Sequence, residues 1–268
     1  MAKYKKKRAR ELQHDRFRDT TMHFFERLGD RLEGRGLTIL YGLGGLLVAA
    51  VLVFGFVKWS NRKSDEARQA LGRAITISKA QIAAAPIAGS TEQTFTSEKE
   101  RAQRAIEEFE KVAAKYGDPY KASSRYFIAT NRLILDRPKA MSELAELGNS
   151  GDSEIAPLAK FALAQAQESD GKLQEAEQLY SDLAKLNSAI VTPETANLRL
   201  AKVYEKLGKK KEASDLLFNI VDASRKAKGE DNLPLPASAA AREAAEALQK
   251  LDPDRYAQLP PENISLAG

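Results

Sequence analysis

The chain has 268 residues, with 42 Lys and Arg against 37 Asp and Glu, 2 histidines and no cysteine. Thiol nucleophiles and disulfide bonds are therefore excluded, and because both histidines, His14 and His23, lie near the N-terminus, residues 58–268 also lack a Ser-His-Asp triad and His- or Cys-ligated zinc. The remaining carboxylates and lysines are spaced as on solvated helix faces, and no GxxxxGK(S/T) phosphate loop follows residue 57. We expect a protein that is not an enzyme and holds no cofactor or metal.

Residues 1–36 form a basic tail. They hold 11 Lys and Arg against 6 Asp and Glu, so the entire net charge of +5 lies in this segment. Its first part, residues 3–10 (KYKKKRAR), is expected to bind anionic lipid of the cytoplasmic leaflet. Nucleic acid is the sharper alternative, but no DNA- or RNA-binding motif flanks this run, and we expect no nucleic-acid partner.

The rest of the tail has apolar residues at helical spacing. One helix face would carry Phe17, Thr21, Phe24, Phe25, Leu28 and Leu32. This spacing predicts an amphipathic helix that lies in the inner membrane interface or packs on the cytoplasmic loops of a partner. Phe24 and Phe25 are its expected membrane-interface contacts.

One uncharged stretch begins at Leu37 and ends at Val57. As a helix its 21 residues would reach about 31 Å, which matches a hydrocarbon core of about 30 Å. A buried core helix, the alternative, would carry a polar stripe. We predict a transmembrane helix that stays attached, because 36 residues precede it and no small-x-small cleavage site follows it. Gly45 and Ala49 form one small-xxx-small pair, a weak signal for a homo-oligomer.

Charge predicts the orientation of this span. Under the positive-inside rule the basic tail places the N-terminus in the cytoplasm. Four basic residues just past the span oppose this placement, but a long domain can translocate despite such charges: Lys58, Arg62, Lys63 and Arg68. We therefore expect the rest of the chain on the opposite side of the membrane, with Trp59 as an interfacial anchor.

Residues 58–96 are predicted to form a linker helix and a loop. The segment 61–84 continues as helix, with small and apolar residues on one face: Ala67, Leu71, Ala74, Ile75, Ser78 and Ile82. We expect this helix to cap the domain that follows. Residues 86–96 are predicted to be a loop.

A repeat occupies residues 97–228. Ala105, Ala140, Ala176 and Ala213 are separated by 35, 36 and 37 residues. Each is followed four and seven positions later by large apolar side chains: Phe109 and Val112, Leu144 and Leu147, Tyr180 and Leu183, Leu217 and Ile220. Such a period is typical of stacked helical hairpins, in which the alanine marks a close approach of two helices. We predict an all-α solenoid of about four degenerate hairpins.

The first helix of each hairpin is less regular than the second. In the last repeat four residues precede Ala213 with tetratricopeptide spacing: Leu200, Ala201, Tyr204 and Gly208. The preceding repeat keeps Leu163, Ala164 and Gly171 but has Gln167 in the aromatic position. The second needs a one-residue adjustment, and the first has no proper leading helix. The pattern resembles degenerate tetratricopeptide repeats, with an irregular all-helical domain as the alternative.

Capping signals agree with these boundaries. Three helix starts are predicted from a capping residue and its neighbour: Ser97 with Glu100, Asp118 with Pro119, and Thr192 with Pro193. Gly171 and Gly208 lie where a helix stops and reverses. Residues 229–268 are predicted to contain a loop, a helix from about Ala237 to Leu251 that closes the far end, and an extended tail that could fold back.

Stacked hairpins predict a concave binding surface. With the usual tetratricopeptide geometry, its inner positions are Leu158, Phe161, Gln165, Glu168, Leu198, Lys202 and Glu205. These residues are expected to hold an extended peptide or the terminus of a partner through many weak contacts. For Phe161 and Leu198, simple core packing is an equal alternative.

The flanks of the span carry a family resemblance. A Phe pair before the span, a Trp-Ser-Asn triplet after it and an Ala-Arg pair in the next helix resemble the YfgM-type ancillary subunit of the bacterial Sec translocon: Phe24, Phe25, Trp59, Ser60, Asn61, Ala67 and Arg68. The resemblance implies a single-pass inner-membrane protein with a cytoplasmic N-terminus and periplasmic repeats. It also implies association with the SecYEG channel and periplasmic chaperones. The longer basic tail and the added C-terminal segment depart from the family.

The function expected from this resemblance is that of a membrane-anchored adaptor at the translocon exit, which binds translocon subunits, periplasmic chaperones or client proteins. The alternative is a structural scaffold for another envelope complex, in division, cell-wall synthesis or secretion. A third class, an envelope enzyme that uses carboxylates only, would require a clustered carboxylate pair in one deep pocket.

Overall fold

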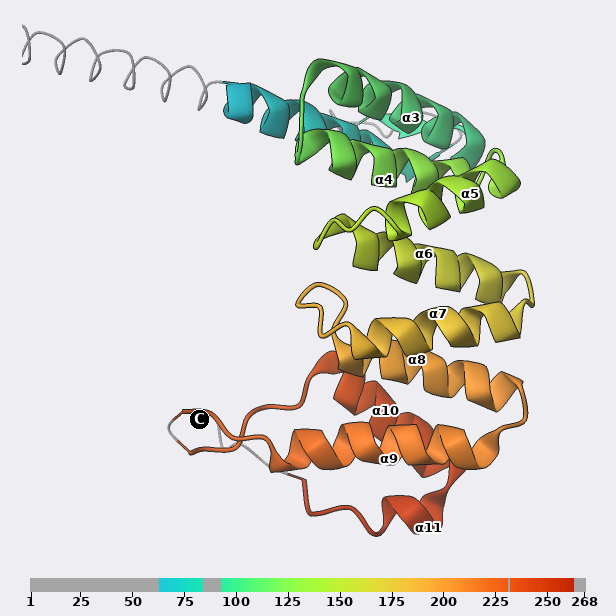
Figure 1. The fold of residues 1–268 in the computed structure, drawn as a ribbon, viewed down its shortest axis with the longest axis vertical. Coiled ribbons are helices and arrows are strands. Elements are labelled where there is room, and N and C mark those ends of the chain that lie inside the picture. The colour runs from blue at the N-terminus through green and yellow to red at the C-terminus, as the bar shows by residue number, and fades with distance from the viewer. Residues whose placement is uncertain (1–62, 84–92, 231, 263–268) are drawn as a thin grey trace, which may run out of the picture. The chain divides into compact units, whose positions relative to one another are not determined.

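The computed structural model describes residues 63–83, 93–230 and 232–262 (Figure 1). The predicted tail and span, with Phe24, Phe25 and Trp59, lie outside the described residues. Within the described ranges, no helix is both long enough and apolar enough to cross a membrane. The chain divides into two units, Met1–Asp65 and Glu66–Gly268, and the fold below is that of the second.

Antiparallel helices make up nearly all of this unit (Figure 1). A helix at 63–78 comes first, followed by two short strands and then nine helices: β1 (Gln81–Ile82), β2 (Thr94–Phe95), α3 (Glu98–Lys115), α4 (Tyr120–Arg132), α5 (Arg137–Gly148), α6 (Ile155–Ser169), α7 (Leu173–Lys185), α8 (Pro193–Lys206), α9 (Lys210–Lys226), α10 (Ala239–Leu251) and α11 (Pro253–Tyr256). Each helix from α3 to α10 packs on the next, and α4 contacts α6 as α8 contacts α10. The described unit is therefore a tetratricopeptide-like stack of helical hairpins.

The four repeat alanines lie on the second helix of each hairpin, α3, α5, α7 and α9. Ala105, Ala140, Ala176 and Ala213 are all 0% exposed. The large side chains four and seven positions later are buried as well: Phe109, Val112, Leu144, Leu147, Tyr180, Leu183, Leu217 and Ile220. The period read from the sequence is thus confirmed in the structure.

The reversals at the glycines are confirmed too. Gly171 and Gly208 both have φ of +74°, which favours a residue without Cβ. In each case the amide after the glycine donates back to the helix, Lys172 N–H to the Gln167 carbonyl and Lys209 N–H to the Tyr204 carbonyl, both at 2.9 Å. These bonds form a Schellman motif, which ends α6 and α8 sharply and turns the chain into the second helix.

The first hairpin has a leading helix, the helix at 63–78, which the sequence analysis predicted as a helix but only as a cap. Ala74 on the helix at 63–78 packs in one cluster with Ala105, Ile106 and Phe109 of α3. The helix at 63–78 therefore takes the place that α4, α6 and α8 take in the later hairpins. The sequence repeat misses it because the connection to α3 is much longer than the turns at Gly171 and Gly208.

The predicted helix through Ile82 is wrong at its end. The helix stops at residue 78, and Ile82 lies in β1, paired in parallel with Phe95 of β2 and 43% exposed. β-branched residues and hydroxyls that bond the backbone weaken a helix end, and the Thr76 and Ser78 hydroxyls donate to the Gly72 and Ile75 carbonyls. The predicted loop likewise contains β2, whose Phe95 is buried.

Two of the three predicted helix starts are confirmed. The Ser97 hydroxyl accepts from Glu100 N–H and caps α3, and the Thr192 hydroxyl accepts from Thr195 N–H with Pro193 in the first turn of α8. The third is shifted. Pro119 is itself the cap of α4 and has no side chain to accept a hydrogen bond, while the Asp118 carboxylate accepts from Ala122 N–H at 3.1 Å.

The far end is closed as predicted. The Ser238 hydroxyl accepts from Ala241 N–H and begins α10, which packs its Ala244 and Leu248 against Leu217 of α9. The tail after α10 is not extended throughout, because the Asp252 carboxylate caps a further short helix, α11. Beyond α11 the chain folds back, and Leu259 joins the same core.

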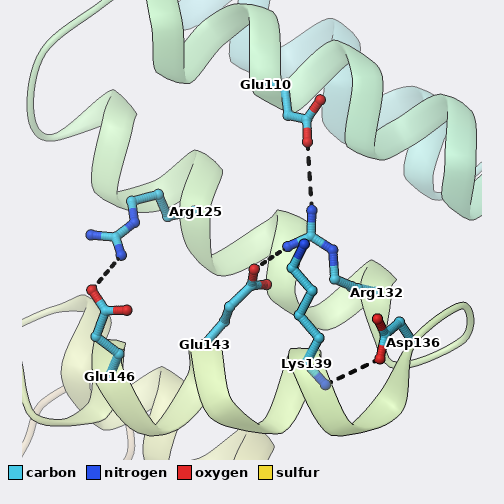
Figure 2. A network of polar contacts seen from close by, with 7 residues as sticks. All are labelled: Glu110, Arg125, Arg132, Asp136, Lys139, Glu143 and Glu146. Atoms are coloured by element: carbon cyan, nitrogen blue, oxygen red, sulfur yellow. Dashed lines mark hydrogen bonds and ion pairs between the residues drawn. The ribbon is translucent and has the colours of Figure 1, made fainter.

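Ion pairs join α3, α4 and α5 (Figure 2). The guanidinium of Arg132 on α4 contacts Glu143 of α5 and lies 3.5 Å from a carboxylate oxygen of Glu110 on α3. A second pair joins Arg125 of α4 to Glu146 of α5 at 2.7 Å. The guanidinium of Arg132 is largely buried, with 15% of the side chain exposed, whereas its partners Glu143 and Glu110 are 29% and 55% exposed.

Candidate functional site

The predicted inner positions lie on α6 and α8, the first helices of two consecutive hairpins. Three of them, Glu168, Lys202 and Glu205, line one hollow of about 650 Å³. The other walls come from α8 and α10, and the lining is mostly charged: Arg199, Lys206, Glu243, Glu246, Ala247, Lys250 and Leu251 complete it. The structure thus brings part of the predicted set together at a surface shared by α6, α8 and α10.

Two ion pairs hold α8 to its neighbours across this hollow. Lys206 reaches Glu168 of α6 with a nitrogen-to-oxygen distance of 2.5 Å, and Lys202 pairs with Glu243 of α10. The hydrogen bond from Lys202, together with the charges of Lys202 and Arg199, lowers the pKa of the Glu243 carboxyl. Glu243 therefore stays ionised, and two ion pairs between neighbouring helices line the hollow.

Glu168 is also held by a hydrogen bond from a buried tyrosine of α7. The hydroxyl of Tyr180, on α7, donates to a Glu168 carboxylate oxygen at 3.1 Å. Tyr180 is fully buried, and Phe161 meets its ring edge-on with a centroid distance of 5.7 Å. Burial and the nearby Glu168 charge raise the pKa of the Tyr180 phenol above its ordinary value, so it remains a neutral donor. Phe161 and Tyr180 thus fix the position of a carboxylate that faces the hollow.

Four charged side chains of the hollow make no hydrogen bond or ion pair within the described part of the chain. Arg199 and Glu205 on α8, and Glu246 and Lys250 on α10, have no side-chain hydrogen bond or ion pair with any described residue. Arg199 is half-buried, whereas the other three are exposed. Charged groups in this position are free to pair with a partner that enters the hollow.

The remaining predicted positions have different surroundings. Leu198 is 4% exposed and packs with α9 and α10, so it belongs to the core. Leu158 and Phe161 are half-buried and pack on the cluster around Tyr180. Gln165 is exposed. The alternative of core packing therefore describes Leu198, and in part Phe161.

The sequence analysis missed Arg199 and the whole α10 wall. A signal exists, since Arg199, Lys202 and Lys206 recur at spacings of three and four, as do Glu243, Glu246 and Lys250. That spacing places each set on one helix face, but it is equally typical of a solvated face. No described group of three or more His, Cys, Asp or Glu residues could hold a metal ion, and what this arrangement can do chemically is bind charged groups of both signs.

Comparison with known proteins finds similarity only at the level of structure. No protein-family model and no curated protein matches the chain. Two crystal structures are similar: nearly identical TPR-like repeats described as those of a kinesin light chain of Podosopora anserina, and a single-substitution variant of the same repeats. Each is 17% identical over 69% of this chain and 84% of the solved chain, with TM-scores of 0.47 and 0.48. At these scores neither adds to what the hairpins themselves establish.

Proposed function

We propose that this chain is a membrane-anchored adaptor whose hollow between α6, α8 and α10 binds an extended segment of a partner protein. One observation carries the proposal: four charged side chains that make no hydrogen bond or ion pair with a described residue line a hollow formed by the first helices of consecutive hairpins. Stacked hairpins bind through such surfaces by adding many weak contacts. The proposal is one of binding rather than catalysis, and two of the four carboxylates that line the hollow, Glu168 and Glu243, are already paired with lysines.

The partner class is proposed from the sequence. The resemblance around Phe24, Phe25 and Trp59 favours the SecYEG translocon, with periplasmic chaperones or client proteins as ligands of the repeats. The charge of residues 1–36 favours a cytoplasmic tail on anionic lipid, and the stretch from Leu37 to Val57 favours a single inner-membrane span with the repeats in the periplasm.

A photo-crosslinking residue at Glu205, in the full chain in intact bacterial cells, tests the hollow. Glu205 is exposed and lines it. Gln174 on α7 is also exposed but does not line it, and serves as the matched control. We expect translocon subunits or periplasmic chaperones to be captured from position 205 and not from 174. Equal capture from both positions, or none from 205, would contradict the hollow as the binding site.

Crosslinking from Phe24 and Trp59 separates the translocon from another envelope complex. Translocon subunits among the products support the adaptor at the channel exit. Their consistent absence, with division, cell-wall or secretion components in their place, would transfer the protein to the scaffold function.

Topology is tested by protease protection and by a compartment-sensitive reporter fused after Gly268. We expect the repeats to resist external protease until the outer membrane is opened, and the reporter to be active in the periplasm. Cleavage only after the inner membrane is also opened would place the repeats in the cytoplasm and remove the periplasmic partners from the proposal.

A further inference from the structure

The three helices that form the hollow run in the same direction. One antiparallel helix separates α6 from α8 and another separates α8 from α10, so all three begin on one side of the stack and end on the other (Figure 1). Two contacts hold α8 and α10 side by side. The Ser238 hydroxyl, at the start of α10, donates to a Glu194 carboxylate oxygen in the first turn of α8 at 2.8 Å, and Lys202 pairs with Glu243 further along both helices. The walls of the hollow therefore share one direction.

This register gives the position of the unpaired charges along the hollow. Glu205 of α8 and Glu246 of α10 each lie three residues beyond the pair of Lys202 and Glu243, so they lie at about the same height in the hollow. Arg199 lies three residues before Lys202, and at 1.5 Å of helix rise per residue it is about 9 Å along α8 from Glu205. The hollow thus has an unpaired cation towards its start and two unpaired carboxylates towards its end.

Arg199 acts on both walls of the hollow through its charge. The pKa of the Glu243 carboxyl on α10 is lowered mainly by the hydrogen bond from Lys202 and further by the charge of Arg199. Burial raises the pKa of the Tyr180 phenol, beside Glu168 of α6, and the charge of Arg199 opposes that rise. Arg199 is half-buried and makes no hydrogen bond with a described residue, so its lost hydration is not replaced. A carboxylate that enters the hollow from outside can replace it.

Glu205 lies where an acidic side chain is unfavourable for the fold. It is in the last turn of α8, and the negative end of a helix dipole disfavours a carboxylate there. The neighbouring cation, Lys206, is taken by Glu168, and Lys250 lies further along α10 in its last turn, where a cation complements the helix end. A residue that breaks a local rule without compensation among the described residues is typical of a functional surface. A cation supplied by a partner would compensate it.

We propose that the hollow binds an extended segment that carries two opposite charges about three residues apart, an acidic side chain at Arg199 and a basic one between Glu205 and Glu246. The spacing follows because about 9 Å equals about three residues of an extended chain at about 3.3 Å each. This inference rests on the binding role in the proposed function and adds the chemistry of the ligand. A segment with two charges of one sign would bring one of them against a like charge of the hollow.

Synthetic peptides test this with the full chain, purified in detergent at low salt. They share one neutral Gly-Ser sequence with a photoreactive residue and differ only at two positions three residues apart. These positions carry Glu and Lys in either order, since an extended chain can enter in either direction, or two Glu, two Lys or two Gln. Mass spectrometry locates the crosslinks. We expect the peptides with both charges to label α8 and α10 about tenfold more than the others, because only they form both charged hydrogen bonds.

Charge reversal should change the preferred peptide. With Arg199→Glu, the peptide with two Lys should label the hollow best, by about tenfold. With Glu205→Lys and Glu246→Lys together, the peptide with two Glu should label it best, by a similar factor. Far-UV circular dichroism checks that each variant is folded, and the comparison of peptides on the unaltered protein decides the inference without them.

Matched controls reverse exposed charges elsewhere on the stack. Lys211→Glu on α9 matches the arginine reversal, and Glu175→Lys on α7 with Glu212→Lys on α9 matches the double reversal, because none of these residues lines the hollow. The controls should keep the preference of the unaltered protein. A change of preference in the controls equal to that in the hollow variants would overturn the inference, since net charge alone would then select the peptide.

The outcomes separate this inference from the function on which it rests. Equal labelling of the hollow by peptides of opposite and of like charge overturns the inference and leaves the hollow as a binding site. Absence of peptide labelling, with partners still captured from position 205 in cells, also overturns it, since other contacts then recognise the partner. Absence of both peptide labelling and capture from position 205 overturns the proposed function as well.

Discussion

Charged residues serve different purposes in two regions of the stack. These are the packed interface of α3, α4 and α5 and the hollow of α6, α8 and α10. In the first, Arg132 is largely buried and binds carboxylates of both neighbouring helices (Figure 2). In the second, ion pairs also cross between helices, but Arg199, Glu205, Glu246 and Lys250 make no hydrogen bond or ion pair with a described residue. A buried, paired cation joins neighbouring helices, whereas unpaired charges on the same type of scaffold provide a binding surface.

The apolar core beneath the two regions should be equivalent, and truncating it should have the largest effect. Leu144 lies beneath the first region and Leu217 beneath the second, and both are 0% exposed. We expect Leu144→Ala and Leu217→Ala each to lower the free energy of unfolding by about 2 to 5 kcal/mol, from lost burial and the cavity left behind. Chemical denaturation of the full chain in detergent, followed by far-UV circular dichroism, measures both. A loss near zero at one site would show that the two cores differ.

Removing one cation from each region should destabilise the protein by different amounts, and these effects should be smaller than those of the core substitutions. Arg132→Met leaves Glu143, whose side chain is 29% exposed, without its cation, and we expect a loss of about 1 to 3 kcal/mol in the free energy of unfolding. Lys202→Met is the matched change in the hollow. Its partner Glu243 is 52% exposed and can return to water, so the expected loss is about 0 to 1 kcal/mol. The comparison fails if the lysine change costs as much as the arginine change in the same denaturation assay.

The buried tyrosine beneath the hollow gives a pH-dependent effect. At neutral pH, Tyr180→Phe should cost about 0.5 to 1.5 kcal/mol through loss of the hydrogen bond to Glu168. Burial raises the pKa of Tyr180 in the folded protein, so the folded state keeps a proton that the unfolded state releases above about pH 10. The stabilisation is therefore present below about pH 10 and falls as the pH rises beyond it, by up to about 1.4 kcal/mol per pH unit.

The Tyr180→Phe variant lacks this titration, so its free energy of unfolding should fall less steeply with pH than that of the unaltered protein. The free energy of unfolding of both proteins should be measured between neutral pH and the alkaline range. The difference between the two profiles removes the contribution of the lysines and the other tyrosines, which both proteins share. Parallel profiles would mean that the phenol titrates normally and does not position Glu168.

The second helices could be predicted from the sequence, whereas the hollow could be predicted only in part. Two helices of each hairpin approach so closely that only a small side chain fits at positions such as Ala176 and Ala213. Alanine therefore recurs at the repeat interval, and the sequence shows this recurrence. The helix at 63–78 breaks the period because β1 and β2 lengthen its connection to α3. Charge pairing carries no local mark: Lys202 and Glu243 are 41 positions apart, and each looks like an ordinary solvated residue on its own helix.

The substitution with the smallest expected effect on stability is also the most direct test of the unpaired charges in the hollow. Arg199 makes no hydrogen bond or ion pair with a described residue and acts on Glu243 only through its charge, so Arg199→Glu should lower the free energy of unfolding by about 1 kcal/mol or less. The same change reverses the charge in the middle of the hollow and should sharply reduce photo-crosslinking from position 205. Lys211→Glu is the matched control, since Lys211 is exposed on α9 and does not line the hollow, and it should leave both quantities unchanged. If Arg199→Glu destabilises the fold as Arg132→Met does, Arg199 is a structural cation and the two regions use charge in the same way. If neither stability nor crosslinking changes, the partner binds elsewhere on the stack.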